Sequence, residues 1–456
     1  MSKQYRPYEP DQRLLLPPNL DEWLPENHMA RFVRDVVGEL DLGPITRYYE
    51  REDRGFPPYH PRMMTQVLLY AYVVGMPSSR KVELKLQEDV AFRFLAAGNQ
   101  PDFRTIAEFR RRHLGALSKL FVQVLLLCQE AGLVKLGHVS LDSTKVKANA
   151  SKHKAMSYER MVKSEAQLEK EIRELLQNAQ ETDDQEDRQY GKDKRGDELP
   201  EELSRRVSRL EKIREAKAAL EARAKKEGDQ KREARQQLEQ AAAEQGKKVA
   251  GTPPKIDDQP SPKAQRNFTD PESSIMKGSD GGFIQAYNCQ AGVDGSSQVI
   301  VACEVSAIAS DGAQVEPMVV EILENLGALP EVASLDAGFF SEANIQGLQD
   351  LGVDPYIAAG RQKHAQESPP PPRGRIPRSA TPKDRMQRKL RTLKGRRVYA
   401  RRKAIVEPVF GQIKGRGFRQ FLLRGEQKVR GEWSLICLSH NLRKLFGRMG
   451  GRWVKN

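Results

Sequence analysis

The sequence is poor in the residues that cross-link small domains or bind soft metals. It contains four cysteines and seven histidines in 456 residues. The cysteines are scattered among apolar neighbours and form no Cys-x-x-Cys pair; they are Cys128, Cys289, Cys303 and Cys437. This pattern excludes a disulfide framework and a thiolate zinc site, and predicts buried thiols in a reducing compartment.

Long apolar runs and several common catalytic motifs are also missing. No run approaches the ~18 apolar residues of a membrane span, and the first residues lack an apolar signal core. The sequence has no G-x-x-x-x-G-K-[ST] loop, no H-E-x-x-H and no G-x-S-x-G. We therefore expect a cytoplasmic protein of two or three domains, with no membrane contact.

Acidic residues are scarce towards one end of the chain. Residues 361–456 hold 27 Lys and Arg against five Asp and Glu, whereas residues 1–360 hold 49 against 57. A basic block on a mildly acidic body predicts a polyanionic partner, and nucleic acid is the first candidate. Between Asp384 and Glu426 the single acid is Glu407. On a helix, Glu407 and Lys414 point the same way, because seven residues make about two turns.

The N-terminal third has helical periodicity. Residues 1–19 are polar and Pro-rich and predict an extended arm, whereas residues 20–136 repeat apolar positions at three and four and predict an all-α domain. The candidate DNA-binding residues of this domain are arginines: Arg80, Arg110, Arg111 and Arg112. A helical scaffold with a solvated arginine face explains the same pattern equally well.

Residues 151–266 differ from the rest of the chain. Apolar residues recur at three, four or seven among Glu, Lys, Arg, Gln and Ala, which predicts two long solvated helices folded into a hairpin or coiled coil, followed by a Pro-rich linker. The stretch reads as an insertion. A partner-binding or dimer-forming arm and a passive spacer are equally compatible with it.

Single acids stand at the ends of two predicted strands. One strand ends at Asp142 and the other at Asp336, and Glu407 belongs to a later helix. Between them the sequence predicts a β-hairpin over residues 283–306 and a helix capped by Asp311. Three acids on separate elements, in a basic surrounding, favour a carboxylate site for hard divalent cations next to phosphate.

Five blocks of the sequence, in this order, resemble the bacterial insertion-sequence transposases of the DDE class. The first comprises His60-Pro-Arg-Met-Met, Ser78-Ser-Arg80 and the stretch from Pro101 to His113. The others are Leu141-Asp142-Ser-Thr-Lys, Tyr287-Asn-Cys-Gln290 with Val293-Asp294, Leu335-Asp336-Ala-Gly-Phe-Phe-Ser, and Val406-Glu407-Pro-Val-Phe-Gly-Gln-Ile-Lys414.

The resemblance implies a fold and a domain plan. It implies an α/β ribonuclease H-like core, a mixed sheet flanked by helices, built from residues 137–150 and 267–425. Residues 20–136 would form the all-α DNA-binding domain, and residues 151–266 a long helical hairpin inserted into the core. Residues 426–456 would add a C-terminal helix.

The resemblance also implies the chemistry. Asp142, Asp336 and Glu407 would be the catalytic ligands of Mg²⁺ or Mn²⁺, two ions in all, for hydrolysis at transposon ends followed by attack of the freed 3′-hydroxyl on target DNA. The expected contacts to DNA phosphates are basic: Lys414, Lys145, Lys147, Arg402, Lys403 and Arg424.

One departure from the family pattern affects two of these residues. Related transposases carry an Arg four residues and a Tyr seven residues before the Glu, where this chain has Lys403 and Ala400. Arg402 and Tyr399 lie one residue earlier.

The implied partners are the terminal inverted repeats of the transposon and target DNA, bound by a homodimer or higher oligomer. Two other interpretations remain open at this stage. One is a metal-dependent ribonuclease H-like nuclease without strand transfer, and the other is a non-enzymatic basic DNA-binding coiled-coil protein.

Overall fold

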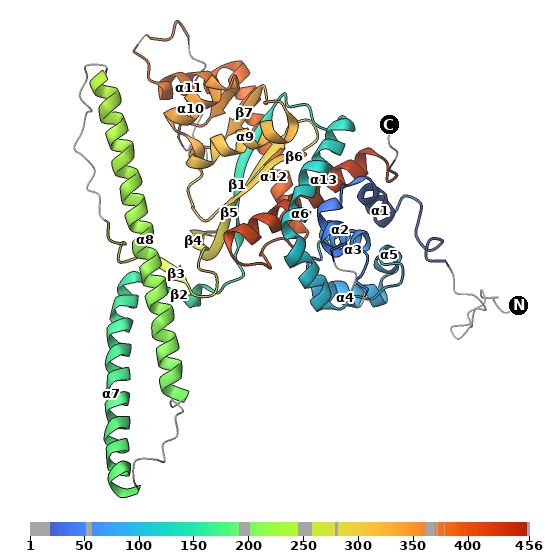
Figure 1. Ribbon diagram of the computed structural model, residues 1–456. Coiled ribbons are helices and arrows are strands. Elements are labelled where there is room, and N and C mark those ends of the chain that lie inside the picture. Colours follow the sequence, from blue (N-terminus) through green and yellow to red (C-terminus); the bar gives the residue numbers. More distant parts are fainter. Residues whose placement is uncertain are drawn as a thin grey trace, which may run out of the picture.

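The computed structural model describes residues 19–51, 57–190, 201–244, 258–278, 281–360, 370, 373–377 and 379–453. Nearly all of the arm predicted at 1–19 and most of the predicted linker before residue 266 lie outside this description. Figure 1 shows a sheet with flanking helices, a helical part towards the N-terminus, and two long helices that project away from both. No helix in the described ranges is long and apolar enough to cross a membrane.

A mixed six-stranded sheet forms the centre of the molecule. Strand β1 pairs antiparallel with β5 and parallel with β7, and β7 pairs parallel with β8. Strands β4 and β6 pair with different parts of β5. The strands are β1 Val139–Lys147, β4 Ser274–Lys277, β5 Phe283–Asp294, β6 Ile300–Ser306, β7 Val332–Leu335 and β8 Asp354–Ile357. The hairpin predicted over 283–306 is therefore confirmed as β5 and β6.

Helices cover both faces of this sheet. Successive residues of a strand point to opposite faces. Leu141 lies on the face of α9, since both it and Ile322 of α9 crowd Gly292, whereas Asp142 bonds Arg402 of α12 on the other face. The helices of this part are α9 Val315–Leu326, α10 Glu342–Asp350, α11 Pro382–Arg391, α12 Leu393–Gly415 and α13 Glu426–Arg448. A mixed sheet between helices is compatible with the predicted ribonuclease H-like core.

The N-terminal part is all-α, as predicted. Its helices are α1 Met29–Glu39, α2 Gly43–Tyr49, α3 Pro61–Val73, α4 Ser79–Glu88, α5 Val90–Leu95 and α6 Phe103–Glu130. Asp102 begins the 28-residue α6, because its carboxylate accepts a hydrogen bond from the Thr105 amide at 2.6 Å.

Helix α13 joins the helical part to the sheet. It packs against α3 and α6 on one side and β6 on the other, so one hydrophobic cluster runs from α1 to α13. Trp433 is fully buried and its indole N–H donates to the Gln290 carbonyl at 3.0 Å. The Asn441 side chain bonds both the amide and the carbonyl of Ile300, at 2.9 and 2.8 Å. The Asn441 bonds satisfy both backbone groups of Ile300 at the start of β6, where the sheet edge would otherwise be open.

Two long helices form a separate arm. Helix α7 spans Tyr158–Tyr190 and α8 spans Glu201–Glu244. They run antiparallel, because Glu165 pairs with Lys217 at 2.8 Å whereas Glu171, further along α7, pairs with Arg206 nearer the start of α8, at 3.6 Å. A small apolar cluster of their own lies between them.

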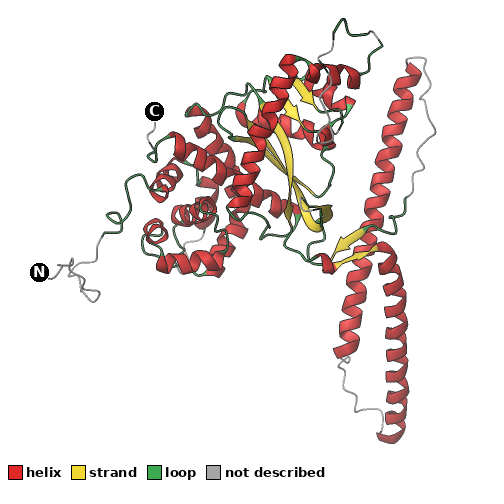
Figure 2. Cartoon of the chain, turned by 180° about the vertical axis from the view of Figure 1, so that it is seen from behind, coloured by secondary structure: helices red, strands yellow, loops and turns green. Residues whose placement is uncertain are grey.

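A two-stranded ribbon, β2 Ala155–Ser157 with β3 Gln265–Asn267, stands at the base of this arm. Figure 2 shows α8 continuing past the ribbon, well beyond the part that faces α7. At about 1.5 Å per residue its 44 residues measure roughly 66 Å.

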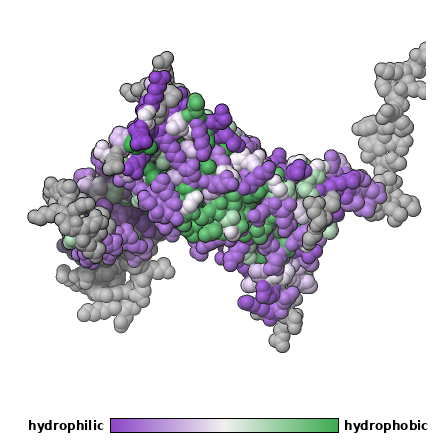
Figure 3. Space-filling view, turned by 90° about the horizontal axis from the view of Figure 1, so that it is seen from above, coloured by the Kyte–Doolittle hydropathy of each residue, from purple (hydrophilic) through white to green (hydrophobic). Residues whose placement is uncertain are grey.

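The surface reflects the high content of charged residues. Figure 3 shows one face on which most side chains are hydrophilic and an apolar area lies near the middle. All four cysteines, by contrast, are free and buried, as the sequence predicts.

Asn441→Leu should destabilise the protein by about 2–5 kcal/mol, because it leaves the Ile300 amide and carbonyl without partners in a dry interface. The control is Lys428→Leu, an exposed position on the same helix. The measurement is the urea midpoint of unfolding. Equal midpoints for the two variants would show that β6 does not depend on Asn441.

Glu321 on α9 should give the stability a pH dependence. Burial raises the pKa of this carboxyl to about 8, although its bond from the Cys303 amide, at 3.1 Å, opposes the shift. A carboxyl with a raised folded-state pKa stabilises the fold fully below its ordinary value near 4.3, and this contribution is lost as the pH rises towards 8.

Glu321→Gln should therefore gain stability relative to wild type as the pH increases from about 5 to 8. The control is Glu324→Gln, an exposed position on the same helix. Parallel plots of unfolding free energy against pH for wild type and both variants would contradict the assignment.

Candidate active site

The register between β1 and β7 brings two aspartates together. Leu141 pairs with Leu335 in the parallel ladder, and the next residues are Asp142 and Asp336. Neighbouring strands lie about 4.8 Å apart, so the two carboxylates start from adjacent points on the sheet. Each also accepts a local amide: Ser143 donates to Asp142 and Gly338 to Asp336, both at 2.8 Å.

Arg402 on α12 is the counter-ion of this pair. Its Nη1 lies 2.7 Å from Asp142 Oδ2, and the side chains of Arg402 and Asp142 are only 10% and 16% exposed. Burial raises the pKa of Asp142, the guanidinium of Arg402 lowers it, and the negative charge of Asp336 raises it. The site is thus a pair of crowded carboxylates with one cation set against them.

Tyr399 completes this cluster from the preceding turn of α12. The Arg402 guanidinium lies 5.9 Å from the centre of its ring, and burial raises the pKa of the phenol, with Asp336 and Asp142 also raising it. Arg402 and Tyr399 thus reach the aspartates from positions one residue earlier than the family pattern places them. Lys403 and Ala400, which occupy the family positions, are exposed.

A second polar network lies beside Asp336. Lys145 Nζ donates to Asn288 Oδ1 at 2.6 Å and to the Ala309 carbonyl at 3.2 Å, and it lies 3.5 Å from Asp311 Oδ1. Asn288 Nδ2 also donates to Asp311 Oδ1, at 2.6 Å. The prediction that Asp311 caps a helix is wrong, since its side chain makes no capping hydrogen bond.

Asp311 is a carboxylate near the site that sequence reasoning missed. A Cβ placed on Gly338 would meet Asp336 Oδ1 at 3.1 Å and Asp311 Oδ2 at 3.2 Å, so both carboxylates flank the same glycine. The short Ser-Asp-Gly stretch resembled a helix start. The available signal was Asn288, whose block belongs to the family pattern and whose amide holds Asp311.

Glu407 lies on α12 beyond Arg402. It is exposed, and it forms no ion pair or hydrogen bond with any residue that the structure describes. Pro408 has no N–H for the Ala404 carbonyl, which accepts Gln298 Nε2 at 2.9 Å instead. This contact ties α12 to the β5–β6 turn just before Glu407. Lys414, two turns on, is half-buried, and burial lowers the pKa of its ammonium.

The donor set is suitable for a hard divalent cation. Asp142 and Asp336 offer carboxylate oxygens on adjacent strands, the ligand type that Mg²⁺ prefers, and their mutual repulsion would be relieved by a cation. Within the described ranges, however, no three His, Cys, Asp or Glu side chains are grouped as a metal cluster. The positive charge next to Asp142 belongs to Arg402 in this structure.

The predicted phosphate contacts lie in different surroundings. Lys147 and Lys403 are exposed, as is Arg424, whose Nε donates to the Asn149 carbonyl at 2.9 Å. Arg402, by contrast, is buried against Asp142, and only 10% of its side chain is exposed.

The four N-terminal arginines also differ in their exposure to solvent. Arg80 is exposed over the Phe103 ring, and Arg111 and Arg112 both pair with Glu108, at 2.7 and 2.9 Å. The prediction for Arg110 is wrong: this side chain is 5% exposed and donates to the Pro77 carbonyl at 2.7 Å, fixing the turn between α3 and α4.

Two protein families match the chain. Residues 18–112 match the family described as Transposase domain (DUF772), and residues 254–442 match Transposase DDE domain. The second match contains Asp336, Glu407 and Lys414, whereas Asp142 lies between the two matches. No curated protein and no solved structure matches the chain.

The first match lies in the helical N-terminal part, and the second covers most of the sheet and the helices after it. Together they define a DNA transposase. The chain belongs to the insertion-sequence transposases of the DDE class. Enzymes of this class generally use divalent metal ions.

Replacing Arg402 should strengthen cation binding at the aspartates. Arg402→Leu removes the positive charge that lies 2.7 Å from Asp142 and also interacts electrostatically with Asp336, so Mn²⁺ should bind at least roughly tenfold more tightly. The control Arg401→Leu removes the same charge from an exposed neighbour. Titration calorimetry with Mn²⁺ compares them, and identical affinities would mean that Arg402 does not compete with metal.

Proposed function

We propose that the protein cuts DNA at the ends of its transposon in a metal-dependent reaction and joins the freed 3′-hydroxyl to target DNA. The observation that best supports this proposal is that Asp142 and Asp336 lie side by side at matched positions of β1 and β7. The chain that carries them belongs to the DDE transposases. Residues 137–150 and 267–425 would form a ribonuclease H-like catalytic core.

Asp142, Asp336 and Glu407 would hold two Mg²⁺ or Mn²⁺ ions in this proposal. Bound ions would supply the charge that activates an attacking oxygen and stabilises the leaving oxygen of the phosphodiester. Glu407 supports the assignment by its position, since it follows Arg402 on the helix that faces the aspartates and is free of other ion pairs among the described residues.

Arg402 would act as a positioning residue. It fixes Asp142 and offsets the repulsion between the two aspartates until metal and substrate arrive. Lys145 is held by Asn288 and Asp311 close to the same carboxylates, at a place where a phosphate oxygen would meet its charge. Lys414, Lys147, Lys403 and Arg424 would contact the DNA backbone further from the cleaved bond.

The remaining parts would deliver the DNA. Residues 20–136 would bind the terminal inverted repeats, with Arg80, Arg111 and Arg112 as the exposed candidates. Residues 151–266 would be an insertion into the core, and residues 426–456 its C-terminal helix. A homodimer or higher assembly would bring two ends to one target.

Glu407→Gln tests the three-acid site. A labelled duplex carrying the element's own end is incubated with Mg²⁺ or with EDTA. With Mg²⁺, the cleavage rate of the variant should be at least about a hundredfold below that of wild type, with DNA affinity unchanged. The control Glu342→Gln replaces an exposed acid of α10 and should cut like wild type. Equal cutting by Glu407→Gln would remove Glu407 from the site.

Joining separates a transposase from a plain nuclease. The same wild-type protein receives an end that is already cut and bears a free 3′-hydroxyl, together with a supercoiled plasmid. Covalent transfer of the labelled strand into the plasmid is expected. If ends are cut but never transferred, the nuclease interpretation replaces strand transfer.

A further inference from the structure

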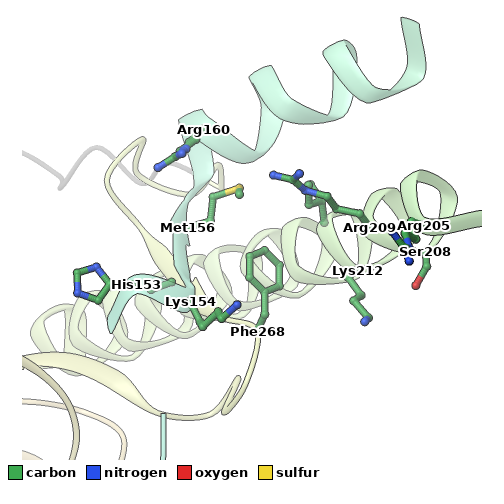
Figure 4. Close-up of a pocket in the computed structure, with 11 residues that line it drawn as sticks. His153, Lys154, Met156, Arg160, Arg205, Ser208, Arg209, Lys212 and Phe268 are labelled. Atoms are coloured by element: carbon green, nitrogen blue, oxygen red, sulfur yellow. The ribbon is translucent and has the colours of Figure 1, made fainter. Parts of the chain in front are cut away.

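A basic pocket lies at the base of the α7–α8 arm, away from the aspartates. Figure 4 shows how side chains from the segment before α7, from α7 itself, from α8 and from the segment after β3 surround it. Its volume is about 720 Å³. None of the described lining residues is acidic. Five of them are Lys or Arg: Lys154, Arg160, Arg205, Arg209 and Lys212.

Most of these cations are not used by the fold. Lys154, Arg160, Arg209 and Lys212 are exposed and form no side-chain ion pair or hydrogen bond within the described part of the chain. Other cations of α8 behave differently: Arg214 and Lys217 pair with Glu165 at 3.1 and 2.8 Å. Arg209 and Lys212 of the same helix instead line the pocket, and they have no side-chain counter-charge among the described residues.

The floor of the pocket is apolar and fixed. Phe268 and Met156 pack against the apolar cluster of the arm, and Ile213 belongs to that cluster. The Phe268 amide donates to the Lys154 carbonyl at 3.0 Å, and Asn267 Nδ2 donates to the Ser151 carbonyl at 2.8 Å. Cations on three separate elements are therefore held around one rigid base, which suits a polyanion with an apolar face.

Exposed cations occur along the chain between the candidate active site and the pocket. Strand β1 carries Asp142 and ends at Lys147, five residues or about 17 Å later. Arg424 bonds the Asn149 carbonyl, and the chain then enters the pocket at Lys154. A duplex with its cleaved bond at Asp142 would follow these cations for several base pairs, at about 3.4 Å per step, before reaching the arm.

We propose that this pocket is a second DNA-binding site, which holds the phosphodiester backbone of the transposon end several base pairs inside the point of cleavage. Arginine and lysine bind phosphate oxygens, and sugar carbons would rest on Phe268 and Met156. This inference rests on the proposed function, because it takes the scissile bond to lie at the aspartates.

The test compares two triple variants. The pocket variant is Arg160→Gln with Arg209→Gln and Lys212→Gln. The control is Lys225→Gln with Lys226→Gln and Lys231→Gln, which removes three exposed cations further along α8, each without a side-chain partner among the described residues. Glutamine keeps the helix propensity, and thermal unfolding checks that both variants fold.

The probe is a series of duplexes that carry the element's end and are shortened stepwise from the internal side. For wild type and control, the affinity should drop sharply at the length that no longer reaches the pocket. The pocket variant should show no such step, and on long duplexes it should bind at least about tenfold more weakly. The slope of log affinity against log salt should fall by about two to three, near one per lost phosphate contact.

Two results would overturn the proposal. The first is a pocket variant that matches the control at every length. The second is a pocket variant that, without DNA, loses an oligomer that wild type and control form, because the pocket would then bind a second copy of the chain. Cleavage of the shortest duplex by wild type is scored in parallel, so that failure of the proposed function is seen separately.

Discussion

The parallel pairing of β1 with β7 is the constraint on which the rest of the structure depends. It places two carboxylates on adjacent strands, and burial makes their repulsion costly. The surrounding elements place charged and polar groups next to these carboxylates. Helix α12 brings a guanidinium to Asp142, and the loop after β6 brings Lys145 a fixed set of oxygens.

Arg402 and Glu407 lie on the same helix, α12, but in different surroundings. The first is buried and committed to Asp142, while the second is exposed and uncommitted among the described residues. Pro408 removes one hydrogen bond of α12 between them, and the side chain of Gln298 replaces it. The helix is therefore attached at Arg402 and Ala404, just before the acid, although the Glu407 carboxylate itself contacts no described residue.

The sequence predicts the elements better than it predicts the contacts between them. Alternation and turn residues locate β5 and β6, and helical periodicity locates α3 and α9, because these signals are local. The surroundings of Arg110 and Asp311 differ from the prediction, because a sequence does not distinguish an exposed Arg from a buried one. Nor does it distinguish an Asp that caps a helix from one that belongs to a hydrogen-bond network. The pocket below the arm combines residues more than fifty positions apart, which no local pattern reveals.

The continuous hydrophobic cluster through α13 has a consequence for how such elements diversify. The helices that would read DNA and the sheet that would cut it share one interior, with Trp433 and Asn441 fitted to β5 and β6 and the opposite side of α13 fitted to α6. A lineage could not exchange its reading domain for another without rebuilding that interior. If the proposed function holds, recognition and catalysis would be inherited together, and new end sequences would be acquired by substitution on the helical surface.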